Sequence, residues 1–158
     1  MRIAFLLLLS GCSLFLRSEG PVSAKDEKYA IDFNSSEWRQ KKNQRSDYVF
    51  ENTKDGRIHL SNSFCDEFQD QPLEKLANKT FKAAGKFTPS NGEYTIFNNR
   101  EAYRLEGTGK VDGVNVQLHL LNTRRDNCYF DFVSITPEAS GTNADSGFDQ
   151  FLKAVKFK

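Results

Sequence analysis

The stretch VNVQLHLL, at Val114–Leu121, shows the clearest periodicity in the chain and decides the fold. Apolar and polar residues alternate along it as far as Leu120. Because successive side chains of a strand point to opposite faces of a sheet, this alternation predicts a β-strand with one buried face and one solvated face. His119 falls on the face that is expected to meet solvent. The side chains expected to point into the core are Val114, Val116, Leu118 and Leu120.

The next strand is predicted at Cys128–Ile135, after a charged hairpin loop, and it has a different pattern. Phe130 and Phe132 lie on one of its faces, and Tyr129 and Val133 lie on the other. A strand that is apolar on both faces must be covered on both. We therefore expect this strand at the centre of the sheet.

An earlier pair of strands is predicted at Ser46–Asn52 and Arg57–Phe64, separated by a turn that contains Asp55–Gly56. The Asp-Gly dipeptide is typical of β-hairpins. Apolar and polar residues also alternate in the second of these strands. Leu60 is therefore expected to face the core, and His59 is expected to face solvent.

Two helices are predicted from apolar residues that recur every three to four positions. The first covers residues 73–84, follows Pro72, and ends before Gly85. The second lies near the C-terminus, and Lys158 suits the negative end of its dipole. Its apolar stripe consists of Phe148, Phe151, Leu152 and Val155.

Two further strands are expected between the first helix and Val114. They cover Glu93–Phe97, which follows a turn at Pro89–Gly92, and Arg100–Thr108. The chain is therefore predicted to have an α+β fold: an antiparallel sheet of about six strands with two helices packed on it, in the order β-β-α-β-β-β-β-α. We expect one domain, at residues 29–158.

This order resembles the Mog1/PsbP-like α+β family over about residues 30–158. The likeness rests on an aromatic start that ends at Trp38, the hairpin turn at Asp55–Gly56, a helix before four strands, and a terminal helix closing on Val155–Phe157. The family includes small bacterial envelope lipoproteins, and its members serve as binding or accessory proteins without a shared active site. The resemblance therefore implies a module that is not an enzyme.

The N-terminus has the features of an export signal. A positive charge precedes the apolar run Ile3–Leu9, and the uncharged stretch, only 14 residues long, is too short to span a bilayer. The run ends in Leu9–Cys12, Leu-Ser-Gly-Cys, which resembles the bacterial lipobox, where a Cys is lipidated and becomes the new N-terminus. We expect a signal peptide at 1–11, and a lipidated Cys12 with a flexible tether at 12–28.

A second processing site is left open by the sequence. Val22–Ala24 has the small residues of an ordinary secretory cleavage site. Cleavage after Ala24 would give a soluble secreted or periplasmic binding protein that begins at Lys25. For the lipoprotein, Ser13 in place of Asp after Cys12 favours the outer membrane, facing the periplasm or the exterior.

Cys65 and Cys128 are the two cysteines that remain after Cys12. An even pair in an exported chain is expected to form a disulfide. The alternative is a thiol enzyme or hydrolase in which one of these cysteines uses His59 or His119 as a base. That chemistry requires a reducing compartment, which the export signal argues against.

His59 and His119 are the only histidines, and both are expected on solvated strand faces. A site that uses both requires their strands to be neighbours. No Cys-x-x-Cys, His-x-His or carboxylate–histidine motif accompanies them. The sequence thus predicts no catalytic, cofactor-binding or metal-ligating residue, and no cofactor.

The charges balance, with 22 basic and 21 acidic residues, so no overall field attracts nucleic acid. One local exception follows Trp38, where a run of basic residues contains no acidic one. It could form a patch for lipid headgroups or another anionic partner, or a solvated loop. We define the basic patch as Arg39, Lys41, Lys42 and Arg45.

The sequence as a whole predicts a non-enzymatic lipoprotein of the cell envelope. Its partners are expected to be a membrane, reached through the lipid on Cys12, and an envelope protein or a small ligand. No nucleic acid is expected among them.

Overall fold

The computed structural model describes residues 23–33, 35–42, 45–66, 70–141 and 143–158. The predicted signal peptide and Cys12 lie outside these residues. The elements are β1 (Tyr29–Ile31), β2 (Trp38–Lys41), β3 (Tyr48–Asn52), β4 (Ile58–Cys65), α1 (Leu73–Ala84), β5 (Phe87–Phe97), β6 (Arg100–Val111), β7 (Val114–Arg125), β8 (Cys128–Pro137), the 3-10 turn η1 (Glu138–Ser140), α2 (Ala144–Lys153) and β9 (Val155–Phe157).

The described strands form two antiparallel sheets. Seven strands form the main sheet in the order β2-β3-β4-β8-β7-β6-β5, and β1 pairs with β9 in a separate sheet of two strands. The predicted α+β class is confirmed, and β8 lies at the centre of the main sheet as its two apolar faces indicate. The core order from β3 to α2 also agrees with the prediction.

The strand count differs from the predicted six for identifiable reasons. The basic run after Trp38 was left open between a binding patch and a solvated loop, and the structure pairs residues 38–41 with β3 as an edge strand. Val155 was expected on the last helix, but α2 ends at Lys153 and residues 155–157 pair with Tyr29–Ile31. The turn predicted at Pro89–Gly92 is absent. Strand β5 continues through these residues, and its pairing with β6 shifts in register between Pro89 and Asn91.

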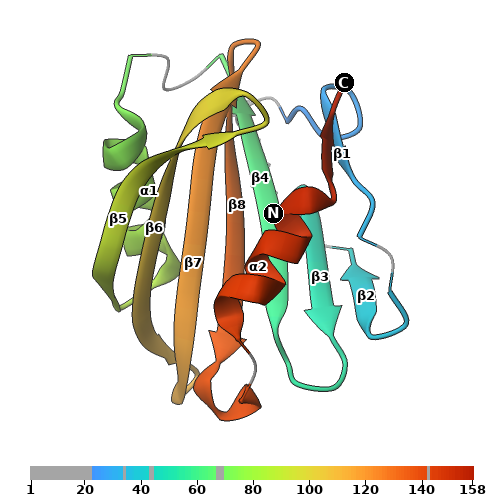
Figure 1. The fold of residues 1–158 in the computed structure, drawn as a ribbon, viewed down its shortest axis with the longest axis vertical. Helices are drawn as coiled ribbons and strands as arrows, with labels where there is room; N and C mark the ends of the chain where they lie inside the picture. The colour runs from blue at the N-terminus through green and yellow to red at the C-terminus, as the bar shows by residue number, and fades with distance from the viewer. Residues whose placement is uncertain (1–22, 34, 43–44, 67–69, 142) are drawn as a thin grey trace, which may run out of the picture.

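Both faces of the main sheet are covered, so the domain has three layers (Figure 1). On one face, α1 packs Leu76 and Phe81 against an apolar cluster that includes Leu118 of β7. On the other face, α2 and the β1-β9 sheet pack against Phe130 and Phe132 of β8. The second covered face has consequences for the histidines, which are described below.

The alternation of apolar and polar residues correctly predicted which side chains share a face of the sheet. It was less accurate about which of them are exposed to solvent. Val116, Leu118 and Leu120 are buried as expected, but Val114 is about half exposed, because it begins β7 at the hairpin end of the sheet. In β4 the expected solvated face is the more buried one, with His59 completely covered and Leu60 only partly. The cause is the layer formed by α2 and the N-terminal segment.

Cys65 and Cys128 form a disulfide in the structure, as predicted. They are directly paired residues at the ends of β4 and β8, with Cα atoms 4.0 Å apart. Both sulfur-bearing residues are buried. The bond therefore joins two neighbouring strands at one end of the sheet.

Residues 23–28, expected at the end of the tether, lie against the domain. Ala24 is buried, and its backbone N–H donates a hydrogen bond to Ser63 Oγ at 2.7 Å. Lys28 Nζ donates to the backbone carbonyl of Asp126 at 2.9 Å. Among the described residues, neither helix has the length and apolar character needed to cross a bilayer.

Candidate functional site

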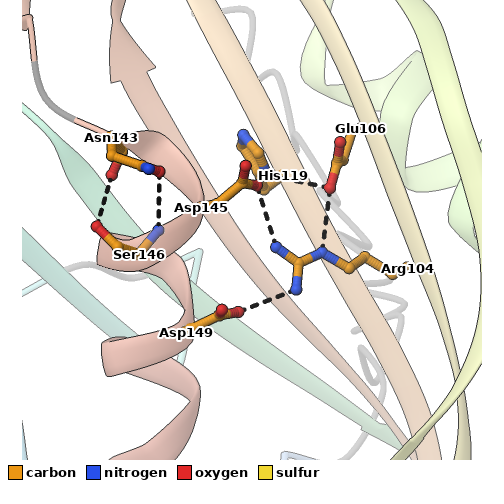
Figure 2. A network of polar contacts seen from close by, with 7 residues as sticks. All are labelled: Arg104, Glu106, His119, Asn143, Asp145, Ser146 and Asp149. Carbon is orange, nitrogen blue, oxygen red and sulfur yellow. Dashed lines mark hydrogen bonds and ion pairs between the residues drawn. The ribbon is translucent and has the colours of Figure 1, made fainter.

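A group of charged side chains lies where the start of α2 packs against β7, next to β6 (Figure 2). Glu106 of β6 and His119 of β7 are directly paired across the two strands. Arg104 lies two residues from Glu106 on β6, so its side chain points to the same face. Asp145 and Asp149 come from α2. We call these five residues the acidic cluster.

The start of α2 positions the two aspartates. Asn143 caps the helix, accepting a hydrogen bond from the backbone N–H of Ser146 at 3.1 Å, and Ser146 Oγ donates to the backbone carbonyl of Asn143 at 3.1 Å. Asp145 therefore lies in the first turn, and Asp149 lies four residues later on the same helix face. Both carboxylates consequently point to β6.

Arg104 links the three carboxylates of the acidic cluster. Its Nε donates to Glu106 Oε1 at 3.1 Å, its Nη2 to Asp145 Oδ1 at 3.3 Å, and its Nη1 to Asp149 Oδ1 at 2.9 Å. Burial opposes the charge on Arg104, but the hydrogen bond to Asp149 and the surrounding carboxylates outweigh it and raise the pKa of Arg104. With one cation and three carboxylates, these four residues keep a net charge of about −2.

His119 is the buried member of the cluster, with 6% of its side chain exposed. Its Nδ1 lies 3.3 Å from Asp145 Oδ1 and 3.6 Å from Glu106 Oε1, yet it makes no hydrogen bond with any described residue. Burial lowers the pKa of His119 although Glu106 and Asp145 act in the opposite direction. The imidazole is therefore neutral at pH 7, and the expected solvated position of His119 is wrong because α2 covers it.

A small hollow of about 170 Å³ opens beside the cluster. Glu106, His119 and Asp145 line it together with Ser90, Gly107, Thr108 and Gln117. The described residues of the hollow offer oxygen and nitrogen acceptors around a net negative charge. Chemically, such an arrangement suits a cation better than an anionic or apolar ligand.

His59 is separate from this cluster. Strand β8 lies between β4 and β7, so Ser134 is paired with both His59 and His119. The condition for a two-histidine site, adjacent strands, is not met. The imidazole ring of His59 is stacked between the rings of Trp38 and Phe151, with ring centroids 4.3 Å and 4.7 Å apart, respectively. Burial, with smaller effects of Arg57 and His119, lowers the pKa of His59 to about 3, so the predicted solvated position is wrong here too.

The two cysteines cannot serve the thiol hypothesis in this structure. A nucleophilic cysteine must be a thiolate, but the Cys65–Cys128 disulfide consumes both thiols. Lys28 Nζ lies 3.4 Å from Cys128 Sγ, so the only described polar contact of this sulfur is with a cation.

The basic patch lies at the opposite edge of the main sheet from β5. Arg39 and Lys41 extend from edge strand β2, and Lys42 follows it. All four residues of the patch are exposed, and Lys41 pairs with Glu51 at 2.8 Å. A hollow of about 550 Å³ is lined by Lys25, Gln40, Lys41, Lys42 and Asp47. The structure thus adds Lys25 to part of the predicted patch.

Comparison of the sequence with protein-family models and with curated proteins finds no match. Solved structures do match. LpqN of Mycobacterium tuberculosis, described as involved in cell envelope biogenesis, superposes with a TM-score of 0.64 at 13% identity, covering 87% of this chain and 89% of LpqN. The fold is PsbP-like. Cyanobacterial PsbP (CyanoP) from Synechocystis matches with a TM-score of 0.58 at 13% identity, over 95% of this chain and 99% of CyanoP.

A third structure with this PsbP-like fold is a protein of unknown function from Pseudomonas aeruginosa, described as a putative regulator. It matches with a TM-score of 0.51 at 11% identity and covers 75% of this chain and 81% of its own. The predicted resemblance to PsbP-like domains is confirmed at the level of the fold. Identities this low carry no site residue from these proteins to this chain.

The sequence analysis missed four members of the acidic cluster: Arg104, Glu106, Asp145 and Asp149. One signal was available. Asp112–Gly113 forms the tight turn between β6 and β7, with positive φ at both residues. Counting back from a two-residue turn places Glu106 opposite His119, so this pair was predictable from the sequence. The aspartates were not, because they depend on where α2 packs.

Proposed function

We propose that this protein is a cell-envelope lipoprotein, anchored through a lipidated Cys12, that acts as a non-enzymatic binding or accessory module. The lipobox-like Leu9–Cys12 supports the anchor. The envelope role described for LpqN, which has the same fold, supports the location. The outer membrane, with the domain facing the periplasm or the exterior, is the placement that Ser13 favours.

The contacts of Ser23 and Ala24 favour one of the two processing sites over the other. Ser23 Oγ donates to Asp47 Oδ1 at 2.6 Å, and Ala24 is buried with its N–H bonded to Ser63. Cleavage after Ala24 would remove both residues and leave Ser63 and Asp47 without these partners. Cleavage before Cys12 retains them, so the packing favours lipoprotein processing.

The surroundings of the predicted reactive groups support a module that is not an enzyme. The disulfide consumes the two thiols, and His59 lies between aromatic rings with neither ring nitrogen hydrogen-bonded to a described residue. A general base must reach the proton that it removes. The buried position of His59 does not allow that contact.

Fatty-acid labelling tests the anchor directly. In bacteria grown with a radioactive or clickable fatty acid, the wild-type protein is expected to carry label, and Cys12→Ala is expected to lose essentially all of it, since the acylated sulfur is gone. Ser13→Ala, which changes the residue directly after Cys12, is the matched control and should carry as much label as the wild type. Equal labelling of the wild type and Cys12→Ala would overturn the proposal.

The basic patch is proposed to rest on anionic lipid headgroups. Lys25, which shares a hollow with Lys41 and Lys42, lies two residues after Ser23, and eleven residues lead from there back to Cys12. A fully extended chain of this length reaches at most about 40 Å. The tether therefore allows this surface to reach the bilayer, and each basic side chain that rests on anionic lipids gains about 1 kcal/mol.

Amine-reactive labelling tests this orientation on the lipidated protein in vesicles. Lys41 and Lys42 should react severalfold more slowly on vesicles with phosphatidylglycerol than on purely zwitterionic vesicles, and high salt should remove the difference. Lys82, on α1, which packs over β5, β6 and β7 at the far end of the main sheet from β2, is the internal control. Equal rates at Lys41 on the two vesicle types, or equal protection of Lys82, would contradict the proposal.

A further inference from the structure

We propose that Glu106, His119 and Asp145 form a binding site for one divalent transition-metal cation of the Zn²⁺ class. The site would use His119 Nδ1 and one carboxylate oxygen from each acidic residue. Nothing in the sequence motifs indicates it, because its ligands come from β6, β7 and α2. The inference is independent of the lipid anchor and of the basic patch.

The first argument is the spacing of the ligand atoms. Four donors about 2.1 Å from a tetrahedral Zn²⁺ lie about 3.4 Å from one another. His119 Nδ1 lies 3.3 Å from Asp145 Oδ1 and 3.6 Å from Glu106 Oε1. Each of the three residues has a ligand atom within 4.8 Å of those of the other two. Small rotations of two carboxylates are therefore enough to close the site.

The second argument is the unsatisfied nitrogen. His119 Nδ1 is buried and has no hydrogen-bond partner among the described residues, although two carboxylate oxygens are close to it. Buried polar atoms normally have a partner, and one that does not calls for an explanation. Three acceptor atoms that converge on one point are explained by a cation bound between them.

Arg104 explains why the carboxylates stay together without the metal. Its guanidinium satisfies Glu106 and Asp145 but makes no described hydrogen bond to His119. Asp149 gives Arg104 a partner outside the metal-ligand set, at 2.9 Å. When a divalent cation binds Glu106 and Asp145, Arg104 can keep its hydrogen bond to Asp149. The two positive charges of the cation would balance the net charge of about −2 that Arg104 and the three carboxylates carry together.

The ligand types select the class of metal. One imidazole and two carboxylates suit Zn²⁺, Co²⁺ or Mn²⁺, whereas Ca²⁺ and Mg²⁺ prefer oxygen ligands alone. Three protein ligands leave a fourth position for water. That position faces the hollow lined by Ser90, Thr108 and Gln117, which is large enough to hold water.

The test uses the mature, tag-free protein after treatment with a chelator, and titrates it with ZnCl₂ in a calorimeter. The wild type should bind one Zn²⁺. Asp145→Asn, which keeps the size of an exposed side chain, should weaken binding at least tenfold. The matched control is Asp149→Asn, on the same helix and bonded to the same arginine, which should stay within about threefold of the wild type.

Co²⁺ provides a second readout that does not depend on heat. The wild type with Co²⁺ should show the strong visible absorption of a four-coordinate site, and both Asp145→Asn and His119→Gln should lose it. His59→Phe should keep it. Absence of Zn²⁺ binding at millimolar concentration in the wild type would overturn the proposal. Equal weakening by Asp145→Asn and Asp149→Asn would also overturn it, because that result indicates only general attraction to negative charge.

Discussion

Replacing both Cys65 and Cys128 with Ala is expected to lower the free energy of unfolding by about 4 kcal/mol. The two residues are 63 positions apart, so the bond closes a long loop and removes many conformations from the unfolded chain. Both are buried, so a single substitution would add an unpaired thiol to the core. The double variant is the cleaner comparison. Urea unfolding followed by circular dichroism measures the change.

The same experiment contains its own control. Chemical reduction of the wild type should shift the urea midpoint in the same direction and by a similar amount. The double variant should still fold, because β4 and β8 also pair through their backbones along eight residue positions. A loss below about 0.5 kcal/mol would mean that the cross-link constrains the unfolded chain much less than loop closure predicts.

The elements that the sequence predicts well are those with a strong local period. The alternation in β7, the apolar faces of β8, the Asp55–Gly56 hairpin and the spacing of α1 are all present in the structure. What alternation does not reveal is the layer that covers each face. His59 and His119 occupy the faces predicted as polar, yet both are buried, because α2 covers the second face of the sheet.

The short strands were missed because long-range pairing creates them. β1 and β9 have three residues each, too few for a period to be visible, and each exists only through the other. The three residues after α2 continue an apolar helical pattern in the sequence. They leave the helix because Val155 pairs with Ile31 and is buried there.

The metal ligands show the same division between local and long-range information. The turn at Asp112–Gly113 determines the register that places Glu106 beside His119, so hairpin geometry alone could have revealed that pair. Asp145 has no such signal. It reaches the pair only because α2 packs across β7, which is a property of the complete fold.

Asp131 is a buried carboxylic acid beneath α1. It lies at the centre of β8, accepts a hydrogen bond from Thr80 Oγ1 at 2.8 Å, and has one oxygen without a partner among the described residues. Burial raises the pKa of Asp131 to about 7, although hydrogen bonds from Tyr129 and Thr80 act against the shift. The folded protein therefore holds this proton more tightly than the unfolded chain does.

The direction of the pH dependence follows from that shift. An ordinary aspartate in an unfolded chain has a pKa of about 3.9. Because the folded pKa is higher, the contribution of Asp131 to stability is fully present below about pH 4 and is lost as the pH rises through about 7. A shift of about three units corresponds to roughly 4 kcal/mol, so the penalty above pH 7 is of that order.

Asp131→Asn is expected to remove this penalty, because the amide has nearly the same shape and stays neutral at every pH. At pH 8 the variant should be more stable than the wild type by an amount that approaches about 4 kcal/mol, whereas at pH 4 the two should be nearly equal. Urea unfolding at pH 4, 6 and 8 measures the difference, and the exposed Asp112→Asn is the matched control. Only an ionised carboxylate makes the stabilities of the wild type and Asp131→Asn diverge as the pH rises. If the difference in their free energies of unfolding did not change with pH, Asp131 would carry no buried charge above pH 7.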